Sequence, residues 1–176
     1  MPTPNRTAVI IVAAGRGLRA GPGGPKQYRT LGGRSVISRA MAAFCGHPQV
    51  AAVQPVVNPD DIAIFNQAVG NIRALAPVNG GATRQASVHA GLEALVATAP
   101  DIVLIHDAAR PFANNALIAR AIEAATITGA AVPVIPVTDT IKQVDARGHV
   151  DATPERAKLR IAQTPQAFRY DVILEA

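Results

Sequence analysis

A glycine-rich basic loop carries the strongest chemical signal near the start of the chain. Residues 13–27 read AAGRGLRAGPGGPKQ, with five glycines and the cations Arg16, Arg19 and Lys26. Glycines let backbone N–H groups approach an anion closely, and the cations can neutralise it. The loop therefore predicts a cradle for a polyphosphate. A glycine-rich turn that merely connects a strand to a helix is the alternative.

Two known glycine motifs match this loop poorly. Lys26 is followed by glutamine, so the Gly-Lys-Ser/Thr ending of a Walker loop is absent. Residues 15–20 fit GxGxxA, but no acidic residue occurs before Asp60. The ribose-binding acid of a dinucleotide site is expected about 20 positions after the motif and is missing. Phosphate binding is therefore favoured over dinucleotide binding.

A second glycine loop precedes a predicted helix. Residues 79–87 read NGGATRQAS, and the expected helix start carries Arg84 and Ser87. Free N–H groups at a helix N-terminus suit a phosphate or the edge of a nucleobase. A simple helix cap at Thr83 is the alternative.

An acidic side chain is expected where a buried strand ends. HDAARPF, residues 106–112, follows an apolar run, so Asp107 should emerge at the carboxyl edge of the sheet, where α/β proteins bind ligands. One carboxylate beside a triphosphate is sufficient for magnesium. The alternative is that Asp107 pairs with Arg110 to fix the loop. Strand alternation points His106 to the opposite face, and we interpret it as structural.

A basic segment precedes a fourth loop, QTPQAF, at residues 163–168. Its cations are Arg156, Lys158 and Arg160. For Lys158 and Arg160, the alternative to binding a phosphate is that they form a basic surface exposed to solvent.

Charge is distributed unevenly along the 176 residues. The net charge is +5, yet residues 1–59 hold seven basic and no acidic side chains. A positive region can attract nucleic acid, an anionic membrane or a phosphorylated small molecule. Tyr28 is the only aromatic residue among these cations, which disfavours nucleic acid. We therefore expect a small phosphorylated ligand.

Length and composition favour one cytoplasmic globular domain, residues 1–176. The apolar runs are shorter than the roughly 20 residues that a membrane span requires, so we expect no membrane partner. The single Cys45 cannot form an internal disulfide, and the four histidines show no metal-binding spacing with it.

Apolar runs alternate with alanine-rich helical patterns, which predicts an α/β fold with a mainly parallel sheet flanked by helices. Buried strands are expected at residues 7–14, 50–57, 101–107 and 130–137. Helices are expected at residues 35–44, 60–69, 84–97 and 114–128, with Ser35 and Asn114 as N-caps and Gly46 and Gly129 as stops. Residues 138–153 suggest a β-hairpin arm that contacts a neighbouring subunit.

Six blocks in this order resemble the 2-C-methyl-D-erythritol 4-phosphate cytidylyltransferases of the non-mevalonate isoprenoid pathway: VAAGRGLR, PKQY, GGATRQAS, HDAARPF, DTIK and QTPQAF. The resemblance covers residues 8 to about 170. It implies a Rossmann-like nucleotidyltransferase fold. The implied reaction joins CTP and the alcohol phosphate to give a CDP-alcohol and pyrophosphate, with magnesium as cofactor.

The resemblance also implies roles for individual residues. Arg19 and Lys26 match the cations that stabilise the transition state, and Asp107 matches the metal ligand. Nucleotide contacts are expected at Ala13, Ala14, Gly15, Gly17, Gly81, Arg84, Ser87 and Ala108. Acceptor contacts are expected at Arg110, Thr140, Arg156 and Thr164. In this family the residue matching Arg156 is often contributed across a homodimer through the hairpin arm.

The sequence departs from the family pattern after QTPQAF, where a further metal-binding Asp and a phosphate-binding Lys normally follow. We therefore expect a chain that lacks its C-terminal segment, either as a fragment or as part of a fusion with the cyclodiphosphate synthase of the same pathway. Ribitol 5-phosphate or another sugar phosphate is an alternative acceptor. A non-catalytic nucleotide-binding fragment is the alternative from another class.

Overall fold

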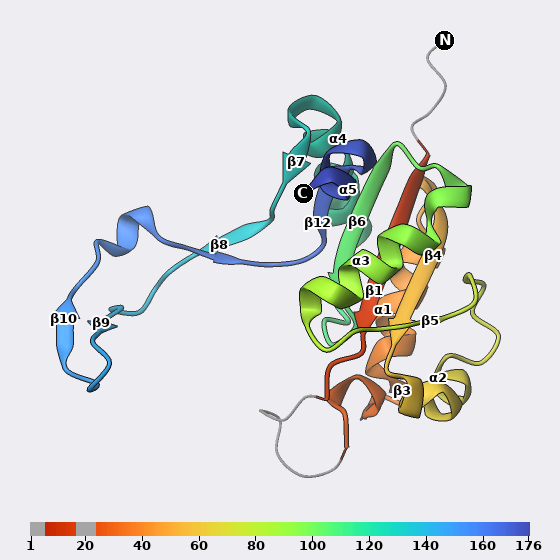
Figure 1. Cartoon of the computed structure of the whole chain (residues 1–176), viewed down its shortest axis with the longest axis horizontal. Coiled ribbons are helices and arrows are strands. Elements are labelled where there is room, and N and C mark those ends of the chain that lie inside the picture. Colours follow the sequence, from red (N-terminus) through yellow and green to blue (C-terminus); the bar gives the residue numbers. More distant parts are fainter. Residues whose placement is uncertain (1–5, 17–23) are drawn as a thin grey trace.

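The computed structural model describes residues 6–16 and 24–176. Within them, a six-stranded sheet has the order β5-β4-β1-β6-β12-β7 (Figure 1). Its strands are β1 (Thr7–Ala13), β4 (Val50–Val57), β5 (Val78–Asn79), β6 (Ile102–Asp107), β7 (Ala130–Ala131) and β12 (Gln166–Arg169). Strand β1 pairs in parallel with β4 and β6, and β4 with β5, whereas β12 is antiparallel to β6 and β7. The prediction of a mainly parallel α/β sheet is confirmed.

Helices cover both faces of this sheet (Figure 1). One face carries α1 (Val36–Cys45), α2 (Ile62–Val69) and α4 (Asn115–Thr128), and the other carries α3 (Arg84–Ala94) and α5 (Tyr170–Glu175). Among the described residues, no helix is both long and apolar enough to cross a membrane.

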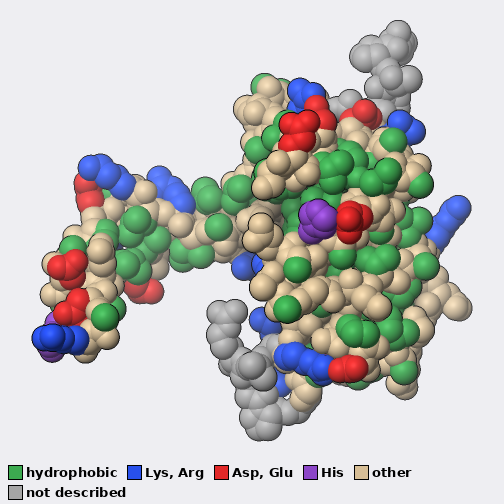
Figure 2. Space-filling model, viewed as in Figure 1, with side chains coloured by type: hydrophobic (Ala, Val, Ile, Leu, Met, Phe, Trp, Pro, Cys, Tyr) green, Lys and Arg blue, Asp and Glu red, His purple; other side chains and the backbone are tan. Residues whose placement is uncertain are grey.

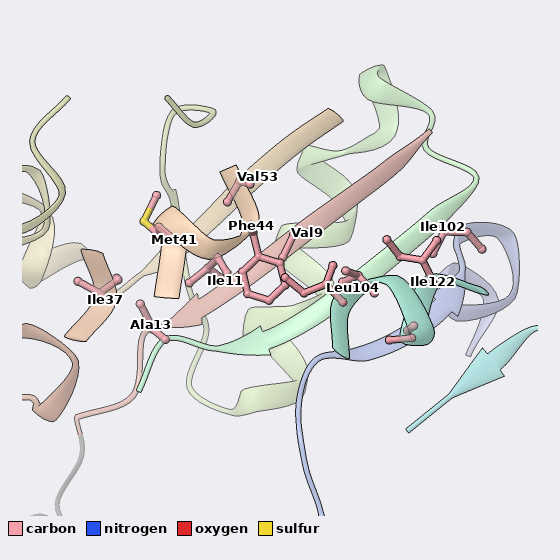
Figure 3. Packing of buried hydrophobic residues seen from close by; sticks show 14 of the residues in the cluster. Val9, Ile11, Ala13, Ile37, Met41, Phe44, Val53, Ile102, Leu104 and Ile122 are labelled. Atoms are coloured by element: carbon pink, nitrogen blue, oxygen red, sulfur yellow. The ribbon is translucent and has the colours of Figure 1, made fainter. Parts of the chain in front are cut away.

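Alternation along β1 divides the core between the two faces. Val9 and Ile11 pack in the cluster that contains Phe44 of α1 (Figure 3), whereas Ile10 packs in the cluster that contains Leu92 of α3. All four of the residues from β1 and α1 are fully buried, and Leu92 is nearly so. A strand that buries both faces needs a continuous apolar run, which is why β1 could be predicted from the sequence.

The predicted helix ends are largely confirmed. The side chain of Ser35 accepts a hydrogen bond from the Ser38 N–H at 3.1 Å, and Asn114 accepts one from the Leu117 N–H at 2.9 Å. Helix α4 ends before Gly129, whose φ of +85° suits glycine. Two predicted boundaries were less accurate. A 3-10 turn, η3 (Pro59–Asp61), precedes α2, and α3 ends at Ala94 and is followed by η4 (Val96–Thr98).

Gly91 allows α3 to lie close against the sheet. A Cβ atom there would lie 2.8 Å from Ile10 Cγ2 and 3.0 Å from Val56 Cγ2. We expect Gly91→Ala to lower the free energy of unfolding by about 1–3 kcal/mol, because overpacking displaces buried neighbours. Urea unfolding measures this change. Glu93→Ala on the exposed side of the same helix is the control, and an equal effect of the two substitutions would contradict the expectation.

The prediction of one buried strand at residues 130–137 was wrong. Strand β7 ends at Ala131, and β8 (Val134–Pro136) pairs instead with β11 (Arg160–Ala162) in a separate antiparallel ribbon. Pro133 and Pro136 have no N–H to donate, so they disfavour a central strand. Val134 and Ile135 are each 48% exposed and do not join the core.

The ribbon leads into an arm that extends away from the sheet (Figure 1). Strands β9 (Gln143–Val144) and β10 (Val150–Ala152) form the predicted hairpin, and the short helix η5 (Arg156–Lys158) follows. The Asp145 carboxylate accepts hydrogen bonds from the backbone N–H groups of Arg147 and His149 at 2.8 and 2.9 Å. Gly148, with φ +83°, completes the turn. Near the start of the chain lie η2 (Lys26–Tyr28), β2 (Thr30–Leu31) and β3 (Arg34–Ser35).

Candidate functional site

The carboxyl ends of β1, β4 and β6 open onto a cleft of about 1000 Å³. Ten predicted site residues line it: Ala13, Ala14, Gly15, Lys26, Gly81, Arg84, Ser87, Asp107, Ala108 and Arg110. Arg19 and Gly17 lie outside the described residues. Thr164 lies behind the cleft wall, and Thr140 and Arg156 lie on the arm. The fold thus brings three of the predicted loops together.

Gln27 ties the first loop to the turn that carries Lys26. Its side-chain amide is almost fully buried and donates hydrogen bonds to the carbonyl oxygens of Ala13 and Gly15, at 2.8 and 3.1 Å. The loop backbone and Lys26 are therefore held in a fixed relation. The sequence analysis missed this residue, because a glutamine in a polar loop gives no sign of burial.

We expect Gln27→Met to lower the free energy of unfolding by about 2 kcal/mol, since one buried and one partly buried hydrogen bond are lost while side-chain volume is kept. Chemical denaturation of the purified variant measures this loss. Gln85→Met, at an exposed position of α3, is the matched control. If the two variants unfold alike, the Gln27 amide does not stabilise the loop.

Arg16 is partly neutralised by its own chain. Its guanidinium group forms an ion pair with Asp60 and lies 3.4 Å from the Asn58 side-chain oxygen. The Arg16 side chain remains 52% exposed at the cleft. Lys26 is exposed at the same cleft.

The second loop contains the helix cap that its sequence offered as the alternative to ligand binding, and its ligand contacts stay a prediction. Thr83 caps α3, because its hydroxyl accepts a hydrogen bond from the Ala86 N–H at 3.0 Å. The buried Ser87 hydroxyl accepts one from the Gly81 N–H at 3.1 Å and donates to the Thr83 carbonyl at 2.9 Å. A Cβ on Gly81 would approach the Ala86 Cβ to 2.5 Å. The loop is therefore fixed by its own contacts, and only glycine fits at residue 81.

Asp107 lies between two arginines. Its Oδ1 atom is 3.3 Å from the Arg84 guanidinium and its Oδ2 atom 3.2 Å from Arg110 Nε. The structural alternative, a pair with Arg110, is thus present, and Arg84 adds a contact that the sequence analysis missed. Among the described residues, no group of three or more His, Cys, Asp or Glu side chains could hold a metal. Asp107 lines the cleft, and its role as a metal ligand stays a prediction.

His106 is fully buried on the other side of the strand, against the ring of Phe44 at a centroid distance of 4.7 Å. Its Nε2 atom lies 2.9 Å from the Arg110 carbonyl oxygen, and its Nδ1 atom lies 3.0 Å from Thr164 Oγ1. Burial lowers the pKa of His106 to about 4, because desolvation disfavours the charged ring. The ring is neutral near pH 7.

The arm residues are not at the cleft of their own chain. Arg156 donates a hydrogen bond to the Thr138 carbonyl at 3.0 Å, and Thr140 lies between β8 and β9. Figure 1 shows the arm reaching away from the carboxyl edge of the sheet. The role of Arg156 and Thr140 toward the acceptor stays a prediction.

A mainly parallel sheet whose carboxyl edge carries a glycine loop, a lysine and an arginine-flanked carboxylate defines a nucleotide-binding α/β protein. The family model described as 2-C-methyl-D-erythritol 4-phosphate cytidylyltransferase, IspD, matches residues 7–176. The chain belongs to this family.

The similarity extends to curated relatives and solved structures. The chain is 80% identical over 176 residues to the bifunctional enzyme IspD/IspF of Nitrobacter hamburgensis, and 74% identical to that of Nitrobacter winogradskyi. Each alignment covers 100% of this chain and 44% of the relative. The chain therefore spans less than half the length of these two curated relatives.

Two solved structures show the shared fold. The 4-diphosphocytidyl-2C-methyl-D-erythritol synthase of Anaerococcus prevotii superposes with a TM-score of 0.82 at 29% identity. The 2-C-methyl-D-erythritol 4-phosphate cytidylyltransferase of Thermus thermophilus superposes with a TM-score of 0.74 at 34% identity. Each match covers 97% of this chain and 73% of the other. The expected Rossmann-like nucleotidyltransferase fold is therefore confirmed.

Proposed function

We propose that this chain transfers CMP from CTP to 2-C-methyl-D-erythritol 4-phosphate, giving the CDP-alcohol and pyrophosphate. The observation that carries the proposal is the convergence of the Gly15 loop, Lys26 and Asp107 on one cleft at the carboxyl ends of β1 and β6. Family membership supports the identity of the two substrates.

The backbone of the cleft suits the nucleotide. Ala13, Ala14 and Gly15 line the cleft with short side chains or none, so a ligand can approach the loop backbone closely. Gly81 and Ala108 face the same space from the second and third loops. Small residues on three sides leave room for a base and ribose, while the loop N–H groups suit the phosphates.

Magnesium fits the donor set at Asp107. Its carboxylate lies at the cleft, and its two oxygens contact the side chains of Arg84 and Arg110. A single carboxylate together with phosphate oxygens and water is a normal magnesium environment. When bound, magnesium would neutralise negative charge on the phosphates. Asp107 is the residue proposed to hold it.

The chain's own cations would do the rest of the chemistry. One oxygen of the acceptor phosphate forms a bond to the α-phosphorus, and the bond from that phosphorus to pyrophosphate breaks. No general base is needed, because a phosphate monoester is already ionised near neutral pH. Lys26, together with the proposed Arg19, would stabilise the charge that develops on the α-phosphate. Arg110 would help to orient the acceptor at the cleft edge.

The arm supports a homodimer. Val144 and Val150 pair across the hairpin and are 54% and 60% exposed, and Ile135 in the ribbon is 48% exposed. A two-stranded ribbon is marginally stable alone, and exposed apolar residues on it suit a second copy of the chain. Arg156 and Thr140 would then be delivered to the partner's acceptor site.

Sedimentation equilibrium tests the dimer. We expect the chain to sediment as a dimer and a Val144→Asp/Val150→Asp variant as a monomer, because buried carboxylates would oppose association. Glu123→Gln on α4 is the control. A monomeric parent protein would contradict the dimer.

Pyrophosphate release tests the transfer. The purified chain is mixed with magnesium, 2-C-methyl-D-erythritol 4-phosphate and each of CTP, ATP, GTP and UTP in turn. We expect release with CTP alone, and much less when ribitol 5-phosphate replaces the acceptor. Release at an equal rate with ribitol 5-phosphate would contradict the assignment of 2-C-methyl-D-erythritol 4-phosphate as the acceptor. A chain that binds CTP and releases no pyrophosphate would be the non-catalytic binding module.

A further inference from the structure

A third arginine lines the cleft and has a different partner from the other two. Arg16 follows Gly15 in the loop after β1, and its side chain reaches the cleft. Arg84 and Arg110, which also line the cleft, both contact the carboxylate of Asp107. Arg16 is thus a cation at the cleft that is held by a group other than the proposed metal ligand.

The loop after β4 supplies the partner of Arg16. The guanidinium group of Arg16 forms an ion pair with Asp60 and lies 3.4 Å from the Asn58 side-chain oxygen. That oxygen also accepts a hydrogen bond from the Asp60 N–H at 3.0 Å, and the Asn58 carbonyl accepts one from the Asp61 N–H at 2.9 Å. Hydrogen bonds therefore fix the turn that carries Asp60, whereas Arg16 reaches this turn through a long side chain.

Sheet pairing brings these two loops together. Strands β1 and β4 are adjacent and parallel (Figure 1), with Ala13 opposite Val57 at their carboxyl ends. Asn58 lines the cleft together with Arg16, whereas Asp60 lies outside the cleft lining. The Arg16 side chain is therefore held at the edge of the cleft by a carboxylate from the neighbouring loop.

The ion pair is too exposed to be mainly a structural contact. The side chains of Arg16 and Asp60 are 52% and 70% exposed. Ion pairs this exposed contribute little to stability, because water and salt screen them. A phosphate group carries more negative charge than a carboxylate and can accept two parallel hydrogen bonds from a guanidinium group. A phosphate bound in the cleft can therefore take Arg16 from Asp60.

We propose that Arg16 binds the β- and γ-phosphates of the nucleotide, and that Asp60 competes with these phosphates for the guanidinium group. The proposal rests on the proposed function, in which Lys26 and Arg19 act on the α-phosphate. The two terminal phosphates carry most of the charge of the triphosphate and leave together as pyrophosphate. Asp60 lowers the affinity for both CTP and pyrophosphate, because Arg16 is available to them only when it has left Asp60.

Calorimetric titration with CTP and magnesium, without the acceptor, tests the proposal. We expect Arg16→Gln to raise the Kd for CTP by about 5- to 20-fold, since a charge-assisted contact to phosphate is lost. Asp60→Asn keeps the size of its side chain and should lower this Kd by about 2- to 5-fold, since the exposed pair that it breaks is weak. Pyrophosphate with magnesium should bind most tightly to Asp60→Asn and most weakly to Arg16→Gln.

CMP is the control ligand, because it lacks both terminal phosphates. Its Kd should change little in either variant. An unchanged Kd for CTP in Arg16→Gln would show that the Arg16–Asp60 pair is a surface contact only, and it would overturn the proposal. Equal weakening of CMP and CTP would place Arg16 at the nucleoside or the α-phosphate and would overturn the proposal as well.

The double variant shows whether Asp60 acts through Arg16. When Arg16→Gln is already present, Asp60→Asn should leave the Kd for CTP unchanged, because the group for which Asp60 competes is absent. A gain in affinity as large as in the parent chain would mean that Asp60 only repels anions in general, and it would overturn the competition. The ligand-free variants should fold as the parent does, because the pair is exposed.

The same titrations separate this proposal from the proposed function. A parent chain that binds neither CTP nor pyrophosphate would contradict the proposed function. A parent chain that transfers CMP, with an Arg16→Gln variant that binds CTP equally well, would overturn the role of Arg16 alone.

Discussion

Lys26→Ala is expected to lower kcat by at least about 100-fold, the size typical of losing one preorganised electrostatic donor. The side chain faces the cleft from η2, and buried Gln27 fixes the backbone beside it against the Gly15 loop. A cation held in place before the reaction stabilises developing charge without reorganising. CTP binding should weaken much less than turnover, because charge on the α-phosphate increases only as the transition state forms.

Initial rates and CTP binding measured on the same preparations check this expectation. Arg120→Ala, at an exposed position of α4 that does not line the cleft, is the control for loss of one positive charge. Near-normal turnover of Lys26→Ala would remove this lysine from the catalytic role. A loss confined to CTP affinity would make it a ground-state contact.

Asp107→Asn is the second substitution that we expect to lower kcat strongly. The amide keeps the size of the side chain but loses the charge that the arginines at residues 84 and 110 now balance. It also removes the only carboxylate proposed for magnesium. Loss of metal-based charge stabilisation costs several kcal/mol, so we expect kcat to fall by on the order of 10²- to 10³-fold.

Magnesium titrations of the rate distinguish this effect from general damage. The Asp107→Asn variant should need a higher magnesium concentration for half-maximal rate, while Glu123→Gln, an exposed carboxylate on α4, should titrate like the parent. The melting temperature of Asp107→Asn should stay close to that of the parent, since the Asp107 side chain is 33% exposed and its arginine pairs are partly solvated. An unchanged magnesium requirement would contradict the assignment of Asp107.

The strands that form the centre of the sheet were predictable because each is a continuous apolar run, as expected for a strand buried on both faces. β4 lies where the apolar run at residues 50–57 placed it, and β1 and β6 end within one residue of prediction. Helix caps at Ser35 and Asn114 follow from local hydrogen bonding, which a short segment determines by itself. The prediction of one strand at residues 130–137 was wrong because its two halves pair with different strands and because it contains two prolines.

The loops of the candidate site were predictable, but the contacts among their side chains were not. Glycines and cations after apolar runs indicate where a ligand binds, since the carboxyl edge is common to open α/β sheets. Whether a polar side chain is exposed depends on residues far away in sequence. Gln27 and Thr164 are both buried, and each forms a hydrogen bond with a residue more than ten positions away, so their burial could not be predicted from the local sequence.

³¹P NMR of the complete reaction tests the central claim most directly. The chain is incubated with CTP, magnesium and 2-C-methyl-D-erythritol 4-phosphate, and the phosphorus signals are followed with time. We predict that the acceptor's phosphomonoester signal is replaced by a pair of coupled diphosphate doublets while pyrophosphate appears in equal amount. Loss of CTP to CMP or CDP with the acceptor signal unchanged, or no change in any signal, would contradict CMP transfer by this chain.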